Sequence, residues 1–170
     1  MIEVRRAVLS DARQIASVGR SSFATAFGYL FPEDVLTRYL EATYADKKIE
    51  GSLAKPNNYF FVAVDKETIL GFLKLKSDCR HRLIPDPLQW QLQKIYVLPA
   101  STDKGIGTLL INFAEPTILE AAPDCCWLQV YAGNPRAQNL YRRVGYETIA
   151  TDIHPIEHIP IPYALMKKTY

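Results

Sequence analysis

The sequence predicts a single-domain protein of the mixed α/β class, and three observations support this. The chain of 170 residues fits one domain, residues 1–170. Runs with the alternating pattern of strands are interspersed with runs of helical period, without a regular β-α repeat. A glycine-rich segment, Lys104-Gly105-Ile106-Gly107-Thr108, separates a strand-like run from a helix-like run. No internal repeat, low-complexity tract or linker interrupts this pattern.

The first part of the chain is expected to contain one strand, several helices and a hairpin. Residues 2–8 have strand character, and Ser10 is a plausible N-cap for a helix from Asp11 to about Ala26. The next expected elements are a helix over 33–44, a short helix over about 47–53, and two strands over 59–64 and 68–76.

The second part begins with a proline-containing segment, residues 77–88, which is expected to be a long loop. Pro116 should kink the helix that follows the glycine-rich segment or end it early. Gly145 is expected as the C′ residue of a later helix. The expected elements are strands over 89–98, 125–131, 147–151 and 163–168, helices over 105–121 and 134–144, and a proline-rich loop over 154–162.

Composition excludes several classes of protein. The formal net charge is only +2, which gives no strong nucleic-acid footprint. The longest apolar runs, such as Phe60-Phe61-Val62-Ala63-Val64, are too short to cross a bilayer, and the first residues lack the apolar core of a signal peptide. We therefore expect a cytoplasmic protein without nucleic-acid or membrane partners.

The cysteines and histidines do not indicate a reactive or metal-binding site. Cys79, Cys125 and Cys126 are expected to be reduced packing residues, because no positioned base for a catalytic thiol is evident. His154 and His158 are four residues apart, but they lie in a segment expected to be a loop, where this spacing does not create a metal site. No metal is expected.

The segment 104–108 has the composition of an anion-binding turn. Glycines allow backbone N–H groups to converge, and the start of a helix adds positive potential. The spacing differs from a P-loop, where the lysine follows the glycines, and from a dinucleotide fingerprint, whose third small residue would replace Leu110. Alone, the pattern is equally typical of a tight strand-to-helix turn without a ligand.

Three segments together resemble the GNAT family of N-acetyltransferases. They are Lys94-Ile95-Tyr96-Val97-Leu98-Pro99, the turn 104–107, and residues 134–146. The last follows the family motif N-x-x-A-x-x-[LF]-Y-x-x-x-G-[FY] at Asn134, Ala137, Leu140, Tyr141, Gly145 and Tyr146. The turn departs from the family at Thr102, where Gln or Arg is common. The run LQKIYVLP and residues 23–28 and 165–168 are similar to the bacterial spermidine/spermine acetyltransferase branch.

The resemblance implies the GNAT fold, in which helices flank a central, mixed, mostly antiparallel sheet with splayed strands. It also implies acetyl-CoA as co-substrate: a strand would pair with the pantetheine arm, the turn would hold the diphosphate, and Val97 N–H would stabilise the oxyanion. Asn134 would both cap its helix and contact the cofactor. The implied cofactor-binding residues are Tyr96, Val97, Leu98, Lys104, Gly105, Ile106, Gly107, Thr108, Asn134 and Tyr141.

The resemblance makes Tyr141 the expected general acid toward the leaving thiolate, because a phenol with a pKa of about 10 is protonated at neutral pH. The alternative is core packing, since Ala137, Leu140, Tyr141 and Val144 share one face of the expected helix. The general base is not identified. Many relatives have Glu on the strand before the turn, where this chain has Gln89, Gln91 and Gln93. By residue type alone, the alternatives are Glu33, Asp34, Asp78, His81 and Asp86.

From these features we expect an acetyl-CoA-dependent N-acetyltransferase that acts on a primary amine of a small molecule by direct attack on the thioester. A polyamine is the leading acceptor, and amino-acid derivatives, aminoglycoside-like amines and a protein N-terminus are alternatives. The protein would act as a monomer or homodimer. A CoA-binding sensor or partner-binding module without turnover is the alternative function, favoured by the missing Glu and opposed by Tyr141.

Overall fold

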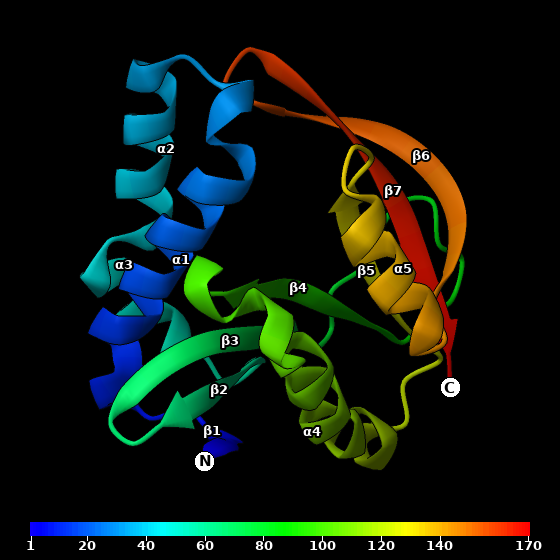
Figure 1. Cartoon of the computed structure of the whole chain (residues 1–170). Helices are drawn as coiled ribbons and strands as arrows, with labels where there is room; N and C mark the ends of the chain where they lie inside the picture. The colour runs from blue at the N-terminus through cyan, green and yellow to red at the C-terminus, as the bar shows by residue number, and fades with distance from the viewer. The chain divides into compact units, whose positions relative to one another are not determined.

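The computed structural model describes residues 1–170 and contains seven strands and five α-helices (Figure 1). The strands have the order β1-β2-β3-β4-β5-β7-β6, in which β4–β5 is parallel and β1–β2, β5–β7 and β6–β7 are antiparallel. The elements are β1 (Ile2–Arg6), α1 (Ala12–Phe27), α2 (Glu33–Tyr44), α3 (Asp46–Leu53), β2 (Asn58–Asp65), β3 (Thr68–Lys76), β4 (Gln89–Val97), α4 (Ile106–Ala121), β5 (Cys125–Tyr131), α5 (Pro135–Arg143), β6 (Glu147–Ile156) and β7 (Ile159–Thr169). The expected fold class is confirmed.

The chain separates into two compact units. The first unit contains Met1–Leu75 and Lys94–Glu115, and the second contains Lys76–Gln93 and Pro116–Tyr170. The boundaries fall inside β4 and inside α4, so each of these elements contributes residues to both units. The units are described separately below.

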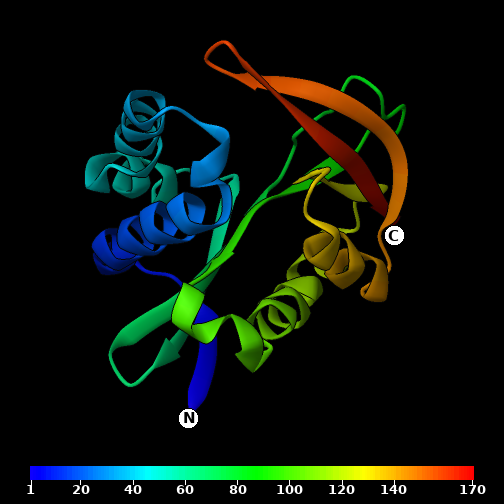
Figure 2. The same ribbon diagram turned by 45° about the horizontal axis from the view of Figure 1, so that its top comes forward.

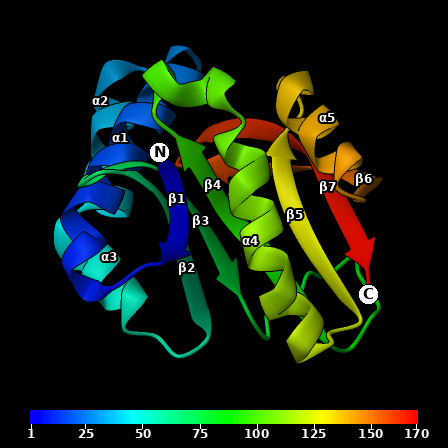
Figure 3. The same ribbon diagram turned by 60° about the horizontal axis from the view of Figure 1, so that its bottom comes forward.

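In the first unit, opposite faces of the strands pack against different helices (Figure 3). Phe60 of β2 stacks on Phe72 of β3, with ring centroids 6.4 Å apart, and Phe72 lies 5.8 Å from Tyr96 of β4. Phe61, the next residue of β2, contacts Phe113 of α4 at 6.0 Å. Because successive strand residues point to opposite faces, α4 covers the face opposite to that of Phe72 and Tyr96.

The face of Tyr96 is covered by an aromatic cluster from α1 and α2, which lie side by side with α3 (Figures 1 and 2). Phe23 of α1 lies 4.7 Å from Tyr39 of α2, and the fully buried ring of Tyr44 meets Tyr96 edge-on at 6.1 Å. Gly19 of α1 faces Tyr44 so closely that a Cβ there would lie 2.3 Å from the ring. Glycine is therefore the residue that lets α1 pack on Tyr44.

The start of α1 differs from the expectation that Ser10 is its N-cap. The helix begins at Ala12, and Asp11 is the N-cap residue. The Asp11 carboxylate is buried and accepts hydrogen bonds from Arg5, at 2.7 and 2.9 Å, and from Val8 N–H at 2.8 Å. The hydrogen bond from Arg5 holds the pKa of Asp11 below its usual value. Asp11 therefore closes the short turn before the helix through Val8, three residues before it, and Arg5, six residues before it.

Pro116 does not end α4, so that alternative of the expectation is wrong. The helix continues to Ala121. Proline removes one backbone hydrogen bond, but Ala114 and Ile118 on either side are almost completely buried. Packing of these side chains keeps the second half of α4 helical. Neither α4 nor any other helix has the length and apolar character that a membrane span requires.

In the second unit, the expected loop over 77–88 covers one face of the strands. Trp127 Nε1 donates a hydrogen bond to Cys79 O at 2.7 Å, and Lys167 Nζ donates to Asp86 at 3.0 Å. A small apolar cluster forms beneath the loop from Ile84, Cys125, Trp127 and Leu165. The three cysteines are free, and burial raises the pKa of the Cys125 thiol to about 11. This supports the expectation that they are packing residues.

The loop expected over 154–162 is wrong, because these residues belong to a long β6–β7 hairpin whose turn lies at Glu157 and His158. Glu157 adopts a positive φ of 52°. The prolines occur at alternate pairs of the ladder, Ile153↔Pro162 and Pro155↔Pro160. Since every second pair of an antiparallel ladder is not hydrogen-bonded, prolines at such positions remove no ladder bond. β6 is also an edge strand, where proline is tolerated.

The contact between Gly19 and Tyr44 predicts the effect of a single methyl group. Gly19→Ala should lower the free energy of unfolding by about 1–3 kcal/mol, the usual cost of overpacking a core. The measurement is urea unfolding followed by circular dichroism. The control is Gly51→Ala in α3, where no atom lies within 4 Å of the added Cβ. That variant should be neutral or slightly stabilising, and equal behaviour of the two variants would contradict the prediction.

Candidate active site

Strand β4 has an open edge in its second half. The ladder between β4 and β5 consists of Gln89↔Cys125, Trp90↔Cys126 and Gln91↔Trp127. Residues 89–92 of β4 are buried, whereas residues 93–97 are only half-buried. The second half of β4 thus leaves one edge without a neighbouring strand, and an extended ligand can pair with such an edge through main-chain hydrogen bonds.

The backbone around Val97 is oriented toward this open edge. The carbonyl oxygen of Tyr96 lies against β3, where a Cβ on Gly71 would approach it to 2.8 Å, and Leu98 N–H donates to Leu70 O at 2.8 Å. The chain has no cis peptide bond. In a trans peptide the N–H is opposite to the carbonyl, so Val97 N–H points away from β3. This is the direction that the predicted oxyanion donor requires; its role in catalysis stays a prediction.

Ser22 of α1 contacts the same edge. Its hydroxyl donates a hydrogen bond to Val97 O at 2.9 Å, and the side chain is only 6% exposed. The carbonyl of Val97 is therefore already paired, while its N–H remains directed to the edge. Ser22 was not among the expected site residues, because its contact with β4 spans 75 positions in the sequence.

The glycine-rich turn has the conformation that an anion cradle needs. A short 3₁₀ helix, Pro99–Lys104, follows β4, and Gly105 adopts the left-handed conformation with φ of 69° immediately before α4. The first α-helical bond runs from Leu109 N–H to Gly105 O at 3.1 Å. The N–H groups of Ile106, Gly107 and Thr108 precede it and have no carbonyl one turn back within the helix.

This geometry fits the diphosphate of CoA. The three N–H groups lie at the positive end of the α4 dipole, and the exposed Lys104 adds a cation beside them. No atom lies within 4 Å of the position of a Cβ on Gly105, so the surroundings of this turn are open. Thr102, where the family often has Gln or Arg, instead donates a hydrogen bond to Pro99 O at 3.1 Å.

The expected site residues of α5 lie in the second unit. Asn134 is the N-cap, and its Oδ1 accepts a hydrogen bond from Ala137 N–H at 3.1 Å. Tyr141 is 7% exposed and packs edge-on against Tyr146 with ring centroids 6.1 Å apart. Gly145 has φ of 99°, as expected for a C′ residue. The capping prediction for Asn134 is confirmed, and the packing of Tyr141 agrees with either role considered for it.

The acidic side chains proposed as bases by residue type include two that are engaged elsewhere. Asp34 pairs with Arg38 at 3.0 Å, and Asp86 pairs with Lys167 at 3.0 Å. His81 stacks edge-on against Trp127 at 4.9 Å, and burial lowers its pKa. On β4, Gln89 binds Ile84 O, and Gln91 accepts a hydrogen bond from Cys79. No carboxylate stands on this strand.

Lys94 of β4 is a charged residue that sequence reasoning missed. Its Nζ lies 4.9 Å from the centroid of the Tyr44 ring and 3.4 Å from Tyr44 Oη. Burial lowers the pKa of Lys94 to about 8 and raises that of Tyr96 to about 12. A lysine between glutamine and isoleucine in a strand gives no sign of burial; only the packing of α2 on β4 creates it.

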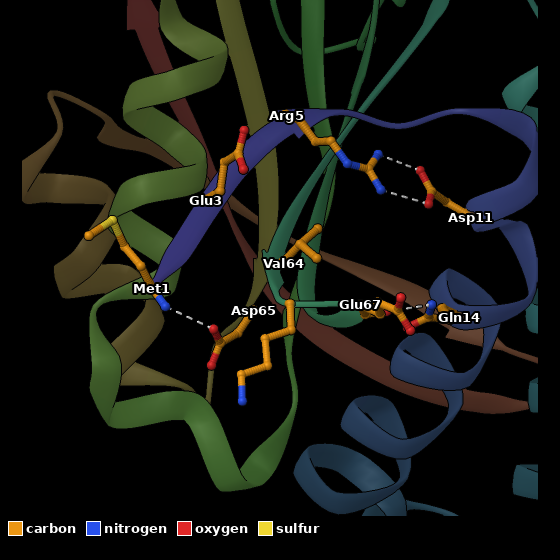
Figure 4. A pocket seen from close by; sticks show the side chains of 9 residues that line it. Met1, Glu3, Arg5, Asp11, Gln14, Val64, Asp65 and Glu67 are labelled. Atoms are coloured by element: carbon orange, nitrogen blue, oxygen red, sulfur yellow. Dashed lines mark hydrogen bonds and ion pairs between the residues drawn. The ribbon is translucent and has the colours of Figure 1, made fainter.

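The rest of the structure brings side chains together in a polar pocket but not in a metal site. No group of three or more His, Cys, Asp or Glu side chains is placed to hold a metal ion. A polar pocket in the first unit lies between β1, the start of α1 and the β2–β3 turn, where Arg5 pairs with Asp11 and the N-terminal amine pairs with Asp65 (Figure 4). Its charged groups largely satisfy one another, and it contains none of the predicted site residues.

Comparisons with known proteins show which proteins this chain is similar to. The model of the acetyltransferase (GNAT) family matches residues 22–146. An uncharacterized N-acetyltransferase from the pepI 3′ region of Lactobacillus delbrueckii subsp. lactis is 31% identical over 136 residues, covering 79% of this chain and 78% of that protein. A spermidine N(1)-acetyltransferase of Thermoplasma acidophilum is 23% identical over 155 residues, covering 89% of this chain and 91% of that protein.

Among solved structures, the PaiA N-acetyltransferase of Thermoplasma acidophilum in complex with coenzyme A has the same fold. The TM-score is 0.81 at 22% identity, with 100% of this chain and 99% of that chain covered. At this level of identity the likeness establishes the fold.

The contact of Gly71 with β4 predicts a loss of acetyl-CoA binding on substitution. In Gly71→Ala the added Cβ would meet the Tyr96 carbonyl at 2.8 Å and side-chain atoms of Val97 and Ile106 at 3.2 and 3.3 Å. The Tyr96 carbonyl belongs to the backbone and cannot avoid the added Cβ by a change of side-chain rotamer. Strand β4 and the start of α4 must therefore shift. We expect the dissociation constant for acetyl-CoA, measured by calorimetry, to rise at least tenfold, whereas Gly51→Ala should bind as the wild type does. Unchanged binding by Gly71→Ala would contradict the assigned position of the cofactor strand.

Proposed function

Since this chain belongs to the GNAT acetyltransferase family, we propose that its acceptor is a primary amine of a small molecule, with a polyamine as the leading candidate. The protein is an acetyl-CoA-dependent N-acetyltransferase, as its family and relatives show. Acetyl-CoA supplies the activated acetyl group as a thioester. The proposal concerns which amine receives it and which side chains assist.

One structural observation carries the proposal: the open second half of β4 is followed directly by the turn at Gly105 and the start of α4. An open edge offers main-chain partners for an extended arm, and the turn offers N–H groups for a diphosphate. We assign Tyr96, Val97 and Leu98 to the pantetheine arm and residues 104–108 to the diphosphate. Asn134 would provide one more contact to the cofactor.

We propose that two groups act on the reacting atoms, one backbone N–H and one side-chain hydroxyl. Val97 N–H would donate to the carbonyl oxygen of the thioester as negative charge develops on it, which is worth most in a site shielded from water. The Tyr141 hydroxyl would give its proton to the departing sulfur. In support of this, Tyr141 occupies the tyrosine position of the family motif on a helix whose cap and C′ glycine are formed as the motif requires.

The polyamine acceptor is supported by one relative. The spermidine N(1)-acetyltransferase of Thermoplasma acidophilum aligns with 89% of this chain, and the PaiA enzyme of that organism shares the fold. Amino-acid derivatives, aminoglycoside-like amines and a protein N-terminus are the competing acceptors. Membership of the family does not distinguish among them, because substrate choice can differ between near relatives.

An amine panel tests the acceptor. Release of CoA is followed with a thiol reagent while spermidine, lysine, an aminoglycoside and a peptide with a free N-terminus are offered separately. We expect the highest kcat/KM for spermidine. Turnover of another amine without turnover of spermidine would exclude the polyamine and leave acetyl transfer intact. Firm binding of acetyl-CoA without turnover of any amine would favour a sensor.

Tyr141→Phe tests the general acid. The substitution keeps the ring and removes only the hydroxyl, so kcat should fall by about 10²–10⁴-fold, the usual contribution of general acid catalysis. The control is Tyr146→Phe, which changes the adjacent ring at a position where the family motif accepts either residue. It should stay within a few-fold of the wild type. A Tyr141→Phe enzyme of nearly normal kcat would mean that Tyr141 only packs.

A further inference from the structure

We propose that Lys94 is the general base that removes a proton from the acceptor ammonium before the amine attacks the thioester. The inference rests on the proposed function and adds the catalytic group that was left open. It starts from the place of Lys94 on the strand that carries the predicted oxyanion donor. Its ammonium group also lies over an aromatic ring and within hydrogen-bond distance of the hydroxyl of that ring.

Lys94 stands three residues before Val97 and two before Tyr96, on the half of β4 whose edge is open. Residues two apart in a strand share a face, so Lys94 and Tyr96 both point toward α2. There, Lys94 Nζ lies over the ring of Tyr44 at 4.9 Å and donates to Tyr44 Oη at 3.4 Å. Tyr44 is itself hydrogen-bonded to Tyr96. This arrangement orients the amine while leaving it able to bind a proton.

The surroundings of Lys94 favour its neutral form. Burial in the aromatic cluster is the cause that lowers its pKa to about 8, and no carboxylate offsets that effect. From α2 it faces the phenol of Tyr44, which lies near those of Tyr39 and Tyr96; burial raises the pKa of all three, so they stay uncharged. The charged groups on the other packed elements are Arg20 of α1, which binds Tyr44 O and lies 3.6 Å from Asp46 of α3, and Lys74 of β3, which lies over Phe60.

Three acidic side chains of this unit are held by cations. Asp11 pairs with Arg5, Asp34 pairs with Arg38, and Asp65 pairs with the N-terminal amine. A carboxylate held by a cation has a lowered pKa and accepts protons poorly at neutral pH. Lysine, in contrast, becomes a base when it is desolvated, because its charged form loses hydration.

The proton balance is simple. Neutral Lys94 Nζ takes one proton from the acceptor ammonium, directly or through one water, and becomes an ammonium itself. The freed lone pair of the acceptor forms the new C–N bond to the acetyl carbon, and the C–S electron pair leaves with sulfur. The nitrogen loses its second proton to solvent as the amide forms. Tyr141 gives its proton to sulfur, and the resulting phenolate takes a proton back from solvent. Lys94 then returns its proton to solvent.

The test compares Lys94→Arg and Lys94→Met with the wild type on two acceptors. The first is the best amine of the panel. The second is its β,β-difluorinated analogue, assayed at a pH above the lowered pKa of its amine, so that this amine is mostly neutral. Arginine keeps the positive charge but cannot act as a base. With the basic amine, both variants should lose about 10²–10⁴-fold in kcat. With the fluorinated amine the loss should shrink to less than about tenfold.

A structural role for Lys94 would produce a different pattern. Lys94→Arg would then retain activity, or both variants would lose the same factor on both acceptors; either result overturns the proposal. The wild-type rate on the basic amine should also fall as pH decreases below about 8, because protonation removes the base. A flat profile between pH 6.5 and 9.5, which needs no variant to fold, would overturn it as well.

Controls separate this inference from the function on which it rests. Both variants should show the wild-type rise in melting temperature with acetyl-CoA, which confirms that the cofactor strand is intact. Lys55→Met, at an exposed lysine of the same unit, should retain full activity. If the wild type turns over amines and Lys94→Arg matches it, only the role of Lys94 is wrong. If the wild type turns over no amine, the proposed function fails together with this inference.

Discussion

The short ladder between β4 and β5 is the constraint on which the candidate site depends. Three pairs, from Gln89 to Gln91, join the start of β4 to β5, and the rest of the strand has a neighbouring strand only on the β3 side. A strand with an unpaired edge must be held by other contacts. Here β3 supports it through Gly71 and Leu70, and α1 supports it through Ser22. The site is therefore a strand that is rigid on one edge and available on the other.

This arrangement also explains why small residues occupy two positions in the first unit. Gly71 allows β3 to approach the Tyr96 carbonyl, which orients the peptide that carries Val97 N–H. Gly19 allows α1 to approach Tyr44, which in turn meets Tyr96 and Lys94. Glycine is required at both positions because a Cβ at either one would collide with the neighbouring element. The packing of α1 and α2 is thus connected through Tyr44 to the strand that carries the site.

The electrostatics of β4 follow from the same packing. Three glutamines and one lysine stand on the strand. Burial lowers the pKa of Lys94 and raises that of Tyr96, in each case opposing the charged form. An uncompensated buried cation costs stability, and such costs are commonly found at functional sites. The phenols around it provide a ring face and a hydroxyl oxygen, which hold the amine in place without neutralising it.

Local signals were sufficient for features that one segment of the chain controls. Asn134 as an N-cap, Gly145 as a C′ residue and Gly105 at the turn before α4 each depend on neighbours within a few positions, and all were readable from the sequence. The order of strands and helices was likewise encoded in hydrophobic periodicity. Two local features were nevertheless predicted wrongly: the N-cap of α1, which is Asp11 bound to Val8 and Arg5, and the segment 154–162, which belongs to the β6–β7 hairpin.

The sequence by itself determined the family, the mixed α/β class, the glycine-rich turn and the tyrosine of α5, because each is written in a contiguous motif. The tertiary structure alone decided which edge of β4 is open, which way Val97 N–H points, and that the half-buried Lys94 lies against the ring of Tyr44. The physical reason is that hydrogen bonding and capping act between neighbours in sequence. Desolvation and edge exposure, in contrast, depend on what other parts of the chain place around a residue.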